Sequence, residues 1–497
     1  MKPQSLNPRT PVVVGAGQLN LTGDEAVGER TDPIRMMAEA TRLAAADAGA
    51  NSLIDKLTSV RIVNILSVRH PNPGRVLADE LGVNPHDTAL SPVGGNSPQS
   101  LVNHACIDLL TGSDEVILIA GCEPWRTRQS AQRSGQALPW IPADPDMKRA
   151  RRTSPEMAMS HEAEIALGIG MPIQVYPIFE TAIRAASGNS PEEHLTQIGE
   201  LWSRFAEVAK SNPYAAEQGG FSAEEIITPS ASNRWIGYPY TKWLVSNDRV
   251  DQSAALILTT VETANALGIS SDRWVFPHTG TDTAEALVSQ RDRLDHSPAI
   301  RIGGHRALEL AEVDVDDIAH LDVYSCFPSA VQIAATELGL GLDRQLTVTG
   351  GLTFAGGPWN NYVTHSIATM VNKLREDAGS KGFITANGGL ISKHAFGVYS
   401  TTPPTDNFRY EYPQDEVDAI PGREVSMDYE GPVNIEAYTV LHDRDLAPSQ
   451  AILTTLNPEG ERRWATSDDA DTMAWLVANE GGGHSAVVRE NSLHLNL

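Results

Sequence analysis

Two stretches of this chain repeat one order of elements, and this repetition limits the possible folds more than any other feature. In residues 91–123, a glycine-rich turn precedes a run with apolar residues at helical spacing. Gly112 ends that run, and 116–120 then reads as a buried strand. The same order of turn, helix and strand recurs in residues 348–390, where 383–386 is the strand. Two copies predict a duplicated α/β unit.

The segments that precede these two stretches also match each other in order. Residues 40–63 and 307–323 each read as a helix, a turn and a short strand. By contrast, residues 278–304 look like a long insertion of mixed helix and loop. Two long helices are predicted near 175–187 and 192–210, in a region rich in proline and charge.

Several short motifs also follow one another in a fixed order along most of the chain. They are residues 11–17, 94–110, 120–123, 245–258, 324–327, 356–358 and 387–389. In this order they resemble the thiolase superfamily, nearest the branch related to the thiolase half of sterol carrier protein 2, and specifically the thiolase-like proteins of type 1.

The resemblance implies an α/β fold: a duplicated, five-layered αβαβα thiolase fold with an added C-terminal antiparallel β-barrel. It places the N-terminal half at residues 1–277, including a loop domain at about 124–239. The C-terminal half follows at 278–402 and the barrel at 405–497. The residues support the last boundary, because Thr401–Thr405 has the composition of a linker.

Short strands broken by turns also predict the barrel without the resemblance. The candidate strands are 431–440, 450–456, 462–465 and 485–488, with a short helix at 469–479. Small barrels bind oligonucleotides or partner proteins, and Arg462, Arg463 and Trp464 have the side chains of a base-stacking surface. Acidic residues surround these three, so a structural or docking module is the favoured interpretation.

The positions that carry thiolase chemistry are altered throughout. A thiolase needs a nucleophilic Cys at the start of the first buried helix, where the helix dipole lowers its pKa, and a His that activates it. The matching positions here are Gly94 and Gly357. The loop 385–389 lacks the second Cys, and 324–327 keeps Cys and Phe but not the His. The fold is therefore expected without Cys-based thiolase activity.

Other side chains near these positions are candidates for chemistry or binding. The candidate catalytic residues are Tyr324, Tyr362, His365, Asn387 and His394. Each one alone more often packs in a core with one hydrogen bond, but around the site that the fold predicts they are expected to line a cleft. Backbone N–H groups at Gly94 and Gly95 form a possible anion site at the start of the helix.

A basic cluster is the candidate for binding coenzyme A. Lys148, Arg149, Arg151 and Arg152 form the densest group of cations in an acidic chain, inside the predicted loop domain. Arg side chains bind phosphates through charge-assisted hydrogen bonds, so this group is a candidate for the phosphates of CoA. A solvated turn is the alternative.

The resemblance implies an acyl-CoA-binding protein, classed with the acyltransferases of lipid metabolism and similar to acetyl-CoA acetyltransferase. Whether it catalyses a reaction stays open. One alternative is a Cys-independent carbon–carbon lyase that cleaves a β-hydroxyacyl-CoA with Tyr324 and Tyr362. Another is a non-enzymatic binding or scaffold protein that acts through the barrel. Thiolases pair through a strand of the N-terminal half, but the type 1 relatives are expected to be monomers, which favours a monomer here.

Composition narrows the partners and the compartment. The formal net charge of −25 makes nucleic acid an unfavourable partner. Three Cys exclude a disulfide framework, and no His or Cys spacing predicts a metal site. No cofactor is expected apart from CoA or acyl-CoA as ligand. With no apolar leader and no apolar run long enough for a membrane helix, a cytoplasmic protein is expected.

Overall fold

The computed structural model describes residues 6–23 and 28–495, and it contains two mixed sheets in the thiolase-like part of the chain. In spatial order, the first sheet consists of β1 (Pro11–Asn20), β8 (Asp251–Thr260), β4 (Val116–Pro124), β2 (Ser59–Ile62), β3 (Asp87–Leu90) and β5 (Arg151–Arg152). The second consists of β10 (His320–Asp322), β11 (Lys381–Gly388), β12 (Lys393–Ser400), β9 (Phe276–Ala284) and β13 (Arg409–Glu411).

The two sheets share one topology, which confirms the predicted duplication. The order β2-β4-β8-β1 in the first sheet corresponds to β10-β11-β12-β9 in the second. In each sheet the first pair is parallel and the next two pairs are antiparallel. Two independent folds would not be expected to agree in both order and direction.

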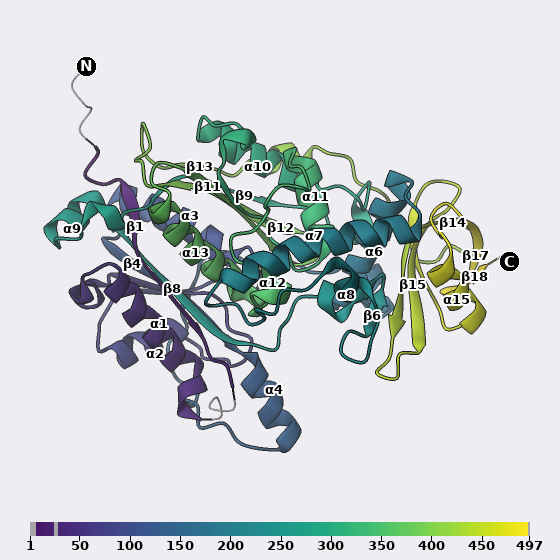
Figure 1. The fold of residues 1–497 in the computed structure, drawn as a ribbon, viewed down its shortest axis with the longest axis horizontal. Coiled ribbons are helices and arrows are strands. Elements are labelled where there is room, and N and C mark those ends of the chain that lie inside the picture. Colours follow the sequence, from purple (N-terminus) through teal and green to yellow (C-terminus); the bar gives the residue numbers. More distant parts are fainter. Residues whose placement is uncertain (1–5, 24–27, 496–497) are drawn as a thin grey trace.

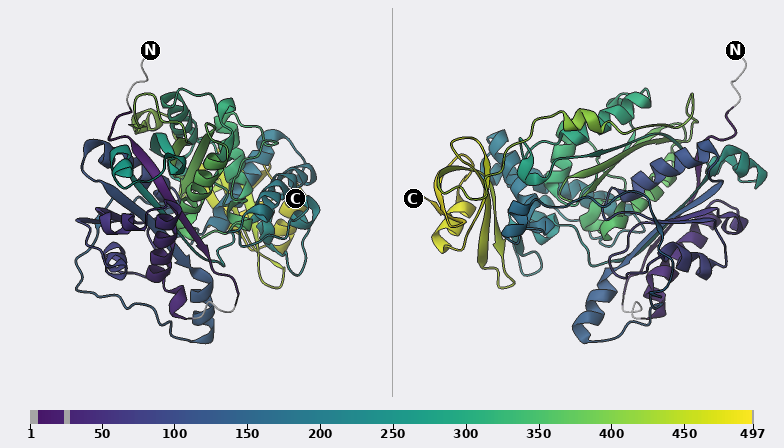
Figure 2. Two further views of the ribbon diagram at one scale, coloured as in Figure 1. Left: turned by 60° about the vertical axis from the view of Figure 1, so that its left-hand side comes forward. Right: turned by 180° about the vertical axis from the view of Figure 1, so that it is seen from behind.

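Helices fill the space between the sheets and cover their outer faces (Figures 1 and 2). The central layer holds α3 (Ser97–Thr111) and α13 (Tyr362–Glu376), which contact each other and both sheets. Outside the first sheet lie α1 (Pro33–Asp47) and α2 (Pro73–Leu81); outside the second lie α10 (Pro298–Leu310) and α11 (Pro328–Leu338). The result is the expected five-layered αβαβα arrangement, with Cys106 buried inside α3.

The interpretation of residues 278–304 as an insertion is wrong. Residues 276–284 form β9, a fully paired strand between β12 and β13. The hydroxyls of Thr279, Thr281 and Thr283 donate to carbonyls of α10 at 2.8, 2.7 and 2.9 Å. These threonines give the strand a polar sequence although its face is buried, so apolar periodicity alone does not reveal it.

The loop domain contains the two predicted long helices, α6 (Pro172–Ser187) and α7 (Pro191–Ser211). The shorter elements are α4 (Trp125–Ser134), α5 (Glu162–Ala166), α8 (Ala223–Ile227), β6 (Trp235–Tyr238) and β7 (Tyr240–Thr241). A buried carboxylate fixes the domain to the C-terminal half: Glu180 on α6 accepts hydrogen bonds from Tyr240 and, at 2.6 Å, from Gln332 on α11. The loop domain is thus hydrogen-bonded to α11 of the C-terminal half.

The C-terminal domain is a closed barrel with one helix, as predicted; it has the four predicted strands and a fifth, β18, that the sequence did not indicate. Its elements are β14 (Gly431–His442), β15 (Pro448–Leu456), β16 (Arg462–Ser467), α15 (Ala470–Ala478), β17 (Ser485–Arg489) and β18 (Ser492–Leu495). The pairs β14–β15, β15–β16, β17–β18 and β17–β14 are antiparallel, and one parallel contact between β16 and β18 closes the barrel. Figure 1 shows it at one end of the molecule, where β6 of the loop domain adds to β14.

Smaller helices complete the fold: α9 (Val261–Ala266), α12 (Gly351–Phe354) and α14 (Gln414–Asp418). Residues 409–411, which the sequence assigns to the barrel, instead form β13 at the edge of the second sheet. Within residues 6–23 and 28–495, no helix combines the length and the apolar character that crossing a membrane requires.

Candidate functional site

The turn at the start of α3 packs against the tip of the β11–β12 hairpin, and both backbones are glycine-rich at the contact. A Cβ at Gly95 would lie 2.5 Å from the carbonyl oxygen of Asn387 and closer still to the Tyr324 hydroxyl. A Cβ at Gly94, the position that matches the nucleophile, would lie 2.4 Å from Oδ1 of Asn96 and 3.3 Å from Nζ of Lys393. Real Cβ atoms do not approach oxygen this closely, so a side chain at position 94 requires the Asn96 side chain to move, and one at position 95 meets the backbone itself.

The position of the activating His is closed in the same way. A Cβ at Gly357 would overlap with Oγ of Ser246 and lie 3.3 Å from the carbonyl oxygen of Asn247. The neighbouring Trp359 has a positive φ of 47°, a conformation rarely adopted by residues other than glycine. In this arrangement, a His at position 357 would have to displace Ser246, and a Cys at position 94 would have to displace Asn96.

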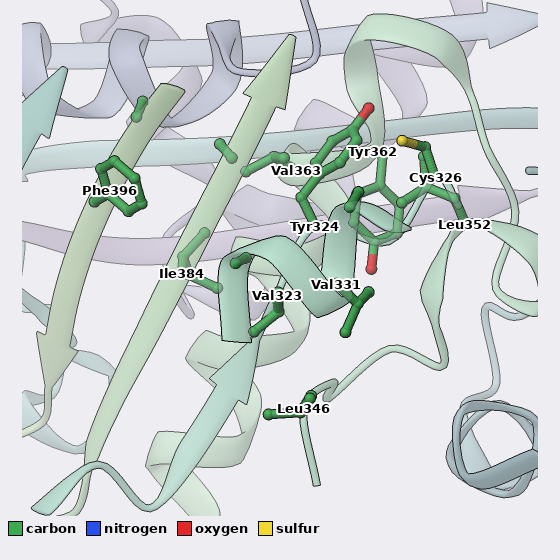
Figure 3. Close-up of a cluster of buried hydrophobic side chains, with 14 of the residues drawn as sticks. Val323, Tyr324, Cys326, Val331, Leu346, Leu352, Tyr362, Val363, Ile384 and Phe396 are labelled. Carbon is green, nitrogen blue, oxygen red and sulfur yellow. The ribbon is translucent and has the colours of Figure 1, made fainter. Parts of the chain in front are cut away.

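Tyr324 and Tyr362 lie edge to face with ring centroids 5.6 Å apart, but their hydroxyls have different roles. The Tyr362 hydroxyl donates to Oδ1 of Asp322 at 2.9 Å and shares a 2.6 Å hydrogen bond with Thr349. No hydrogen bond of the Tyr324 hydroxyl is found in the described part of the chain. Figure 3 shows the two hydroxyls pointing in opposite directions. Of the two, only Tyr324 offers a free phenol.

Asn387 and His394 lie side by side on β11 and β12, behind the Tyr324 ring. They line a cavity of about 10 Å³ together with Tyr324. Oδ1 of Asn387 and Nε2 of His394 are buried and have no partner. Burial and the charge of Arg291 lower the pKa of His394 to about 3, so this imidazole is neutral at physiological pH. The structure thus brings together three of the five candidate catalytic residues.

His365 lies apart from this group, on the other side of Tyr362. It bonds through Nδ1 to Oε1 of Gln18 at 2.9 Å, and a second cavity of about 10 Å³ lies beside it, lined also by Gln252 and Tyr362. Burial lowers its pKa to about 3. A group from the central helix of the second half therefore faces a different void from Asn387 and His394.

Lys393 is the residue of this site that the sequence reasoning missed. It is the first residue of β12, is 4% exposed, and directs its ammonium group to the start of α3, where Nζ donates to the carbonyl oxygen of Val93 at 2.5 Å. Burial lowers its pKa, and Glu156 opposes that shift. The available signal was a lysine at the head of the otherwise strand-like 393–400, where a buried cation is unusual.

The loop between β11 and β12 is held in a strained conformation. Ile391 has a positive φ of 56°, which is a true outlier for a β-branched residue. The buried guanidinium of Arg291 donates to the carbonyl oxygens of Leu390 and Ile391. Strain of this kind persists only where surrounding contacts hold it, and it is common at functional loops.

A cavity of about 940 Å³ lies next to this loop, where three parts of the chain meet. Its walls come from residues 157–162 of the loop domain, 284–301 of the C-terminal half and 414–427 before the barrel. The lining includes Arg293, Arg301 and Arg423, but each of them is paired with a carboxylate. The cavity therefore has the size of a ligand site without a surplus of positive charge.

Two residues of the predicted CoA-binding cluster belong to a strand, and the other two precede it. Arg151 forms a two-bond ion pair with Asp87 at 3.0 and 2.7 Å, and Arg152 donates to the carbonyl oxygen of Ser91 at 2.8 Å. Both belong to β5, the edge strand of the first sheet. All four side chains of the cluster are exposed, those of Arg151 and Arg152 by 50% and 49%. Lys148 and Arg149 lie outside the strand, whereas Arg151 and Arg152 already have partners within it.

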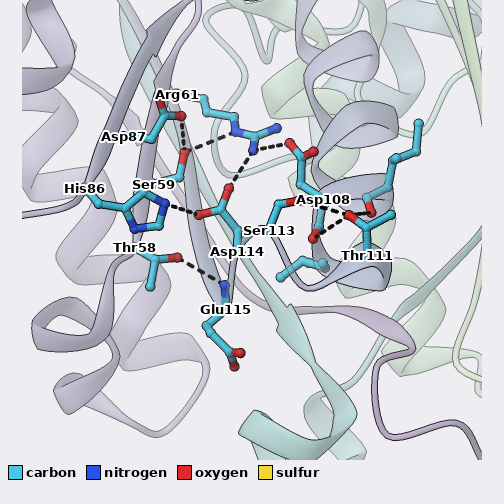
Figure 4. A network of polar contacts seen from close by, with 12 residues as sticks. Thr58, Ser59, Arg61, His86, Asp87, Asp108, Thr111, Ser113, Asp114 and Glu115 are labelled. Atoms are coloured by element: carbon cyan, nitrogen blue, oxygen red, sulfur yellow. Dashed lines mark hydrogen bonds and ion pairs between the residues drawn. The ribbon is translucent and has the colours of Figure 1, made fainter.

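A polar network fixes α3 at its other end (Figure 4). Arg61 on β2 is 1% exposed and bonds to Asp108 at 2.5 Å and to Asp114 at 3.0 Å. Its Nε bonds to Ser59, which donates to Asp87 at 3.0 Å. Since Asp108 lies in the last turn of α3, this network sets the position of the helix whose start forms the candidate site.

In the barrel, the proposed stacking surface is buried. Arg462 is 0% and Trp464 1% exposed, and Nε1 of Trp464 donates to Ser289 of the C-terminal half at 2.8 Å. These two side chains contact the C-terminal half and do not form an exposed stacking surface. Within residues 6–23 and 28–495, no group of three or more His, Cys, Asp or Glu side chains has the arrangement of a metal site.

Comparisons with known proteins agree with these observations. A family model described as the thiolase-like protein type 1 additional C-terminal domain matches residues 413–492. The crystal structure of a monomeric SCP2-thiolase-like protein type 1 from Mycobacterium smegmatis is 31% identical, with a TM-score of 0.83, over 98% of this chain and 99% of that one. None of the curated proteins compared with the chain matches it.

Two further structures share the fold at lower identity. The Ltp2-ChsH2(DUF35) aldolase is 16% identical with a TM-score of 0.59, over 80% of this chain and 98% of that one. The dimeric peroxisomal thiolase of Saccharomyces cerevisiae is 14% identical with a TM-score of 0.57, over 80% of this chain and 98% of that one. At these identities, the likeness concerns the fold alone.

Proposed function

Because the chain belongs to the SCP2-thiolase-like proteins of type 1, we propose that it binds an acyl-CoA at the start of α3 without Cys-based thiolysis. The absence of thiolysis follows from glycine at both matching positions, Gly94 and Gly357, where a new side chain would also have to displace Asn96 or Ser246. The thiolase fold remains, and the residues that replace its catalytic groups leave one free phenol, Tyr324, at the site.

The observation that carries the binding proposal is the pair of unpaired acceptors behind Tyr324. The Asn387 amide nitrogen donates to Tyr176 at 3.2 Å, which leaves Oδ1 as an acceptor, and the neutral His394 bonds to the backbone at Ile391. Each buried polar atom without a partner costs about 1–3 kcal/mol. A ligand with N–H or O–H donors removes that cost, and the pantetheine arm of CoA carries amide N–H groups.

Binding there requires a movement of Tyr324. A cavity of about 10 Å³ holds one water molecule and no acyl chain. The Tyr324 side chain lies between this cavity and the backbone at Gly95. Rotation of its ring would extend the cavity to the start of α3. The neighbouring cavity of about 940 Å³ offers room for the rest of a CoA molecule.

Isothermal titration with CoA, acetyl-CoA and a long-chain 3-ketoacyl-CoA tests the proposal, with a product assay on each mixture. We expect saturable binding and no thiolysis. Tyr324→Phe keeps the ring and is expected to retain binding, whereas His394→Phe fills the cavity and is expected to weaken binding about tenfold or more, by the loss of one buried hydrogen bond. No binding at millimolar ligand contradicts the proposal, and thiolysis at an enzymatic rate contradicts the assignment of Gly94 and Gly357.

The non-enzymatic alternative has one specific observation in its favour. Arg151 and Arg152, half of the expected CoA-binding cluster, lie half-exposed in the β5 strand and already have partners, Asp87 and the carbonyl oxygen of Ser91. A protein that presents the barrel to a partner needs no CoA site. The same titration separates the two proposals, because a scaffold protein gives no heat with any of the three CoA ligands.

The lyase alternative with two tyrosines is not favoured by the geometry. The Tyr362 hydroxyl is committed to Asp322 and Thr349, so it does not share a substrate with Tyr324. The likeness to an aldolase adds nothing here, because at 16% identity it concerns the fold.

A further inference from the structure

Lys393 occupies the space beside the turn where the thiolase fold would carry its nucleophile. Its Cε and Nζ atoms lie 3.3 Å from the place of a Cβ at Gly94. Only two polar atoms of the described chain contact Nζ: the carbonyl oxygen of Val93 at 2.5 Å and Sδ of Met159 at 3.7 Å. No described carboxylate forms an ion pair with it. The amine is therefore buried with one strong acceptor.

This environment favours the uncharged amine over the ammonium ion. A buried ammonium ion is costly unless a carboxylate compensates it, and Lys393 has no such partner in contact. The start of α3 also carries the positive end of the helix dipole, which disfavours a second positive charge beside it. Burial also lowers the pKa of Lys393, although the charge of Glu156 acts to raise it. Uncharged lysine is a nucleophile for carbonyl carbon.

The protein also holds this side chain in place. Arg291 bonds to the carbonyl oxygens of Leu390 and Ile391, three and two residues before Lys393, and Ser392 N donates to Gly388 O at 3.1 Å. Lys393 itself pairs with Gly388 and with Ala284 across two strands. A fixed backbone on both sides is what a reacting group needs for a defined approach.

We propose that Lys393 forms an imine with the keto carbon of a 3-oxoacyl thioester; the choice of a thioester rests on the acyl-CoA binding proposed above. The amine nitrogen bonds to the carbonyl carbon to give a carbinolamine. The carbonyl oxygen then leaves as water with the two hydrogens of the amine, and a carbon–nitrogen double bond remains. No oxidant, reductant or metal is required for this step.

Access to the amine is controlled by Met159. Its Sδ touches Nζ, and its side chain, from the segment between β5 and α5, is 38% exposed. Replacement by a smaller residue opens a path from solvent to Lys393. If Lys393 were only structural, this opening would make it as reactive toward carbonyl compounds as an exposed lysine and no more.

Reductive trapping tests the proposal. The full-length protein is incubated at pH 7 with acetoacetyl-CoA, or with methyl acetoacetate as a probe without CoA, in the presence of sodium cyanoborohydride, and the modified lysines are located by peptide mass spectrometry. Lys210 and Lys373, whose side chains are 55% and 46% exposed, serve as internal references. We expect severalfold more adduct at Lys393 than at either reference, because burial without a paired carboxylate leaves a larger share of this amine uncharged at pH 7.

Two variants complete the test. Lys393→Met removes the principal adduct, and Met159→Ala increases its rate of formation severalfold. Adduct confined to the exposed lysines, or the same yield at Lys393 as at Lys210, overturns the inference; this comparison uses the unmodified sequence and does not depend on a variant that folds. Trapping with methyl acetoacetate but no binding of acetoacetyl-CoA in the titration supports the amine and contradicts the CoA site. Binding of acetoacetyl-CoA without an adduct at Lys393 supports the CoA site and contradicts the reactive amine.

Discussion

At the start of α3, close packing against the backbone limits which side chains fit. We predict that Gly95→Cys lowers the free energy of unfolding by about 1–3 kcal/mol, because the new side chain must displace Tyr324 and the Asn387 carbonyl. Urea unfolding measures this effect. Gly170→Cys is the matched control, since a Cβ there meets nothing within 4 Å. Equal stability of both variants would contradict the packing described.

A second residue-scale prediction concerns Glu123, at the end of β4. Its buried carboxylate accepts from the backbone N–H groups of Leu66 and Ser67, yet burial raises its pKa from 4.5 to about 7. Between these values the folded state keeps a proton that the unfolded state has lost. Stability therefore falls as pH rises through this window, by up to about 3 kcal/mol at 1.36 kcal/mol for each unit, and it is constant above it.

Chemical unfolding from pH 4.5 to 8 in the unmodified chain and in Glu123→Gln measures this effect. The variant cannot titrate at this position, so its stability relative to the unmodified chain should increase as pH rises. Parallel curves for the two proteins would show that Glu123 has the same pKa in both states.

At the scale of elements, the helices and strands with apolar buried faces could be predicted from the sequence, and those with polar buried faces could not. Apolar spacing identifies α3, α13 and the barrel strands because their buried faces are apolar. The same criterion missed β9, whose threonines satisfy carbonyls of α10, and it missed Lys393 on β12. Hydrogen bonds between layers depend on which helix lies opposite, and one sequence without its fold does not contain that information.

The edge of the first sheet provides a prediction at this scale. β5 pairs with β3 at residues 89–90, so residues from the loop domain cover the outer edge of β3. We predict that Arg151→Glu combined with Thr153→Pro uncovers this edge and causes self-association. The first change opposes Asp87, and the second removes the N–H that bonds to Leu90 O at 3.3 Å. Exposed β-edges pair with other chains.

Sedimentation velocity over a concentration series measures the association. A half-exposed ion pair contributes only about 0.2–1 kcal/mol, which is why both changes are combined. Arg149→Glu is the control, because this exposed residue lies outside β5. A double variant that remains a monomer at all concentrations would show that β5 is not what keeps the edge unpaired.

At the scale of the whole molecule, Arg462 joins the barrel to the C-terminal half. It is 0% exposed, bonds to Glu436 at 2.7 and 2.6 Å, and donates to the carbonyl oxygens of Val288 and Ser289 at 3.2 and 3.0 Å. Removing one partner of such a network leaves the others buried without compensation, at a cost on the order of 3–5 kcal/mol. We therefore predict that Arg462→Met lets the barrel unfold separately from the rest.

Scanning calorimetry distinguishes the outcomes, since a docked barrel unfolds with the core in one transition and an undocked barrel adds a second one at lower temperature. The neighbouring Arg463 is the matched control: it is 6% exposed, and its hydrogen bond to Asn491 stays within the barrel. Arg463→Met should lower the transition temperature slightly and keep a single transition. If Arg462→Met also unfolds in one transition near the original temperature, the contacts of β6 with β14 hold the barrel without the arginine.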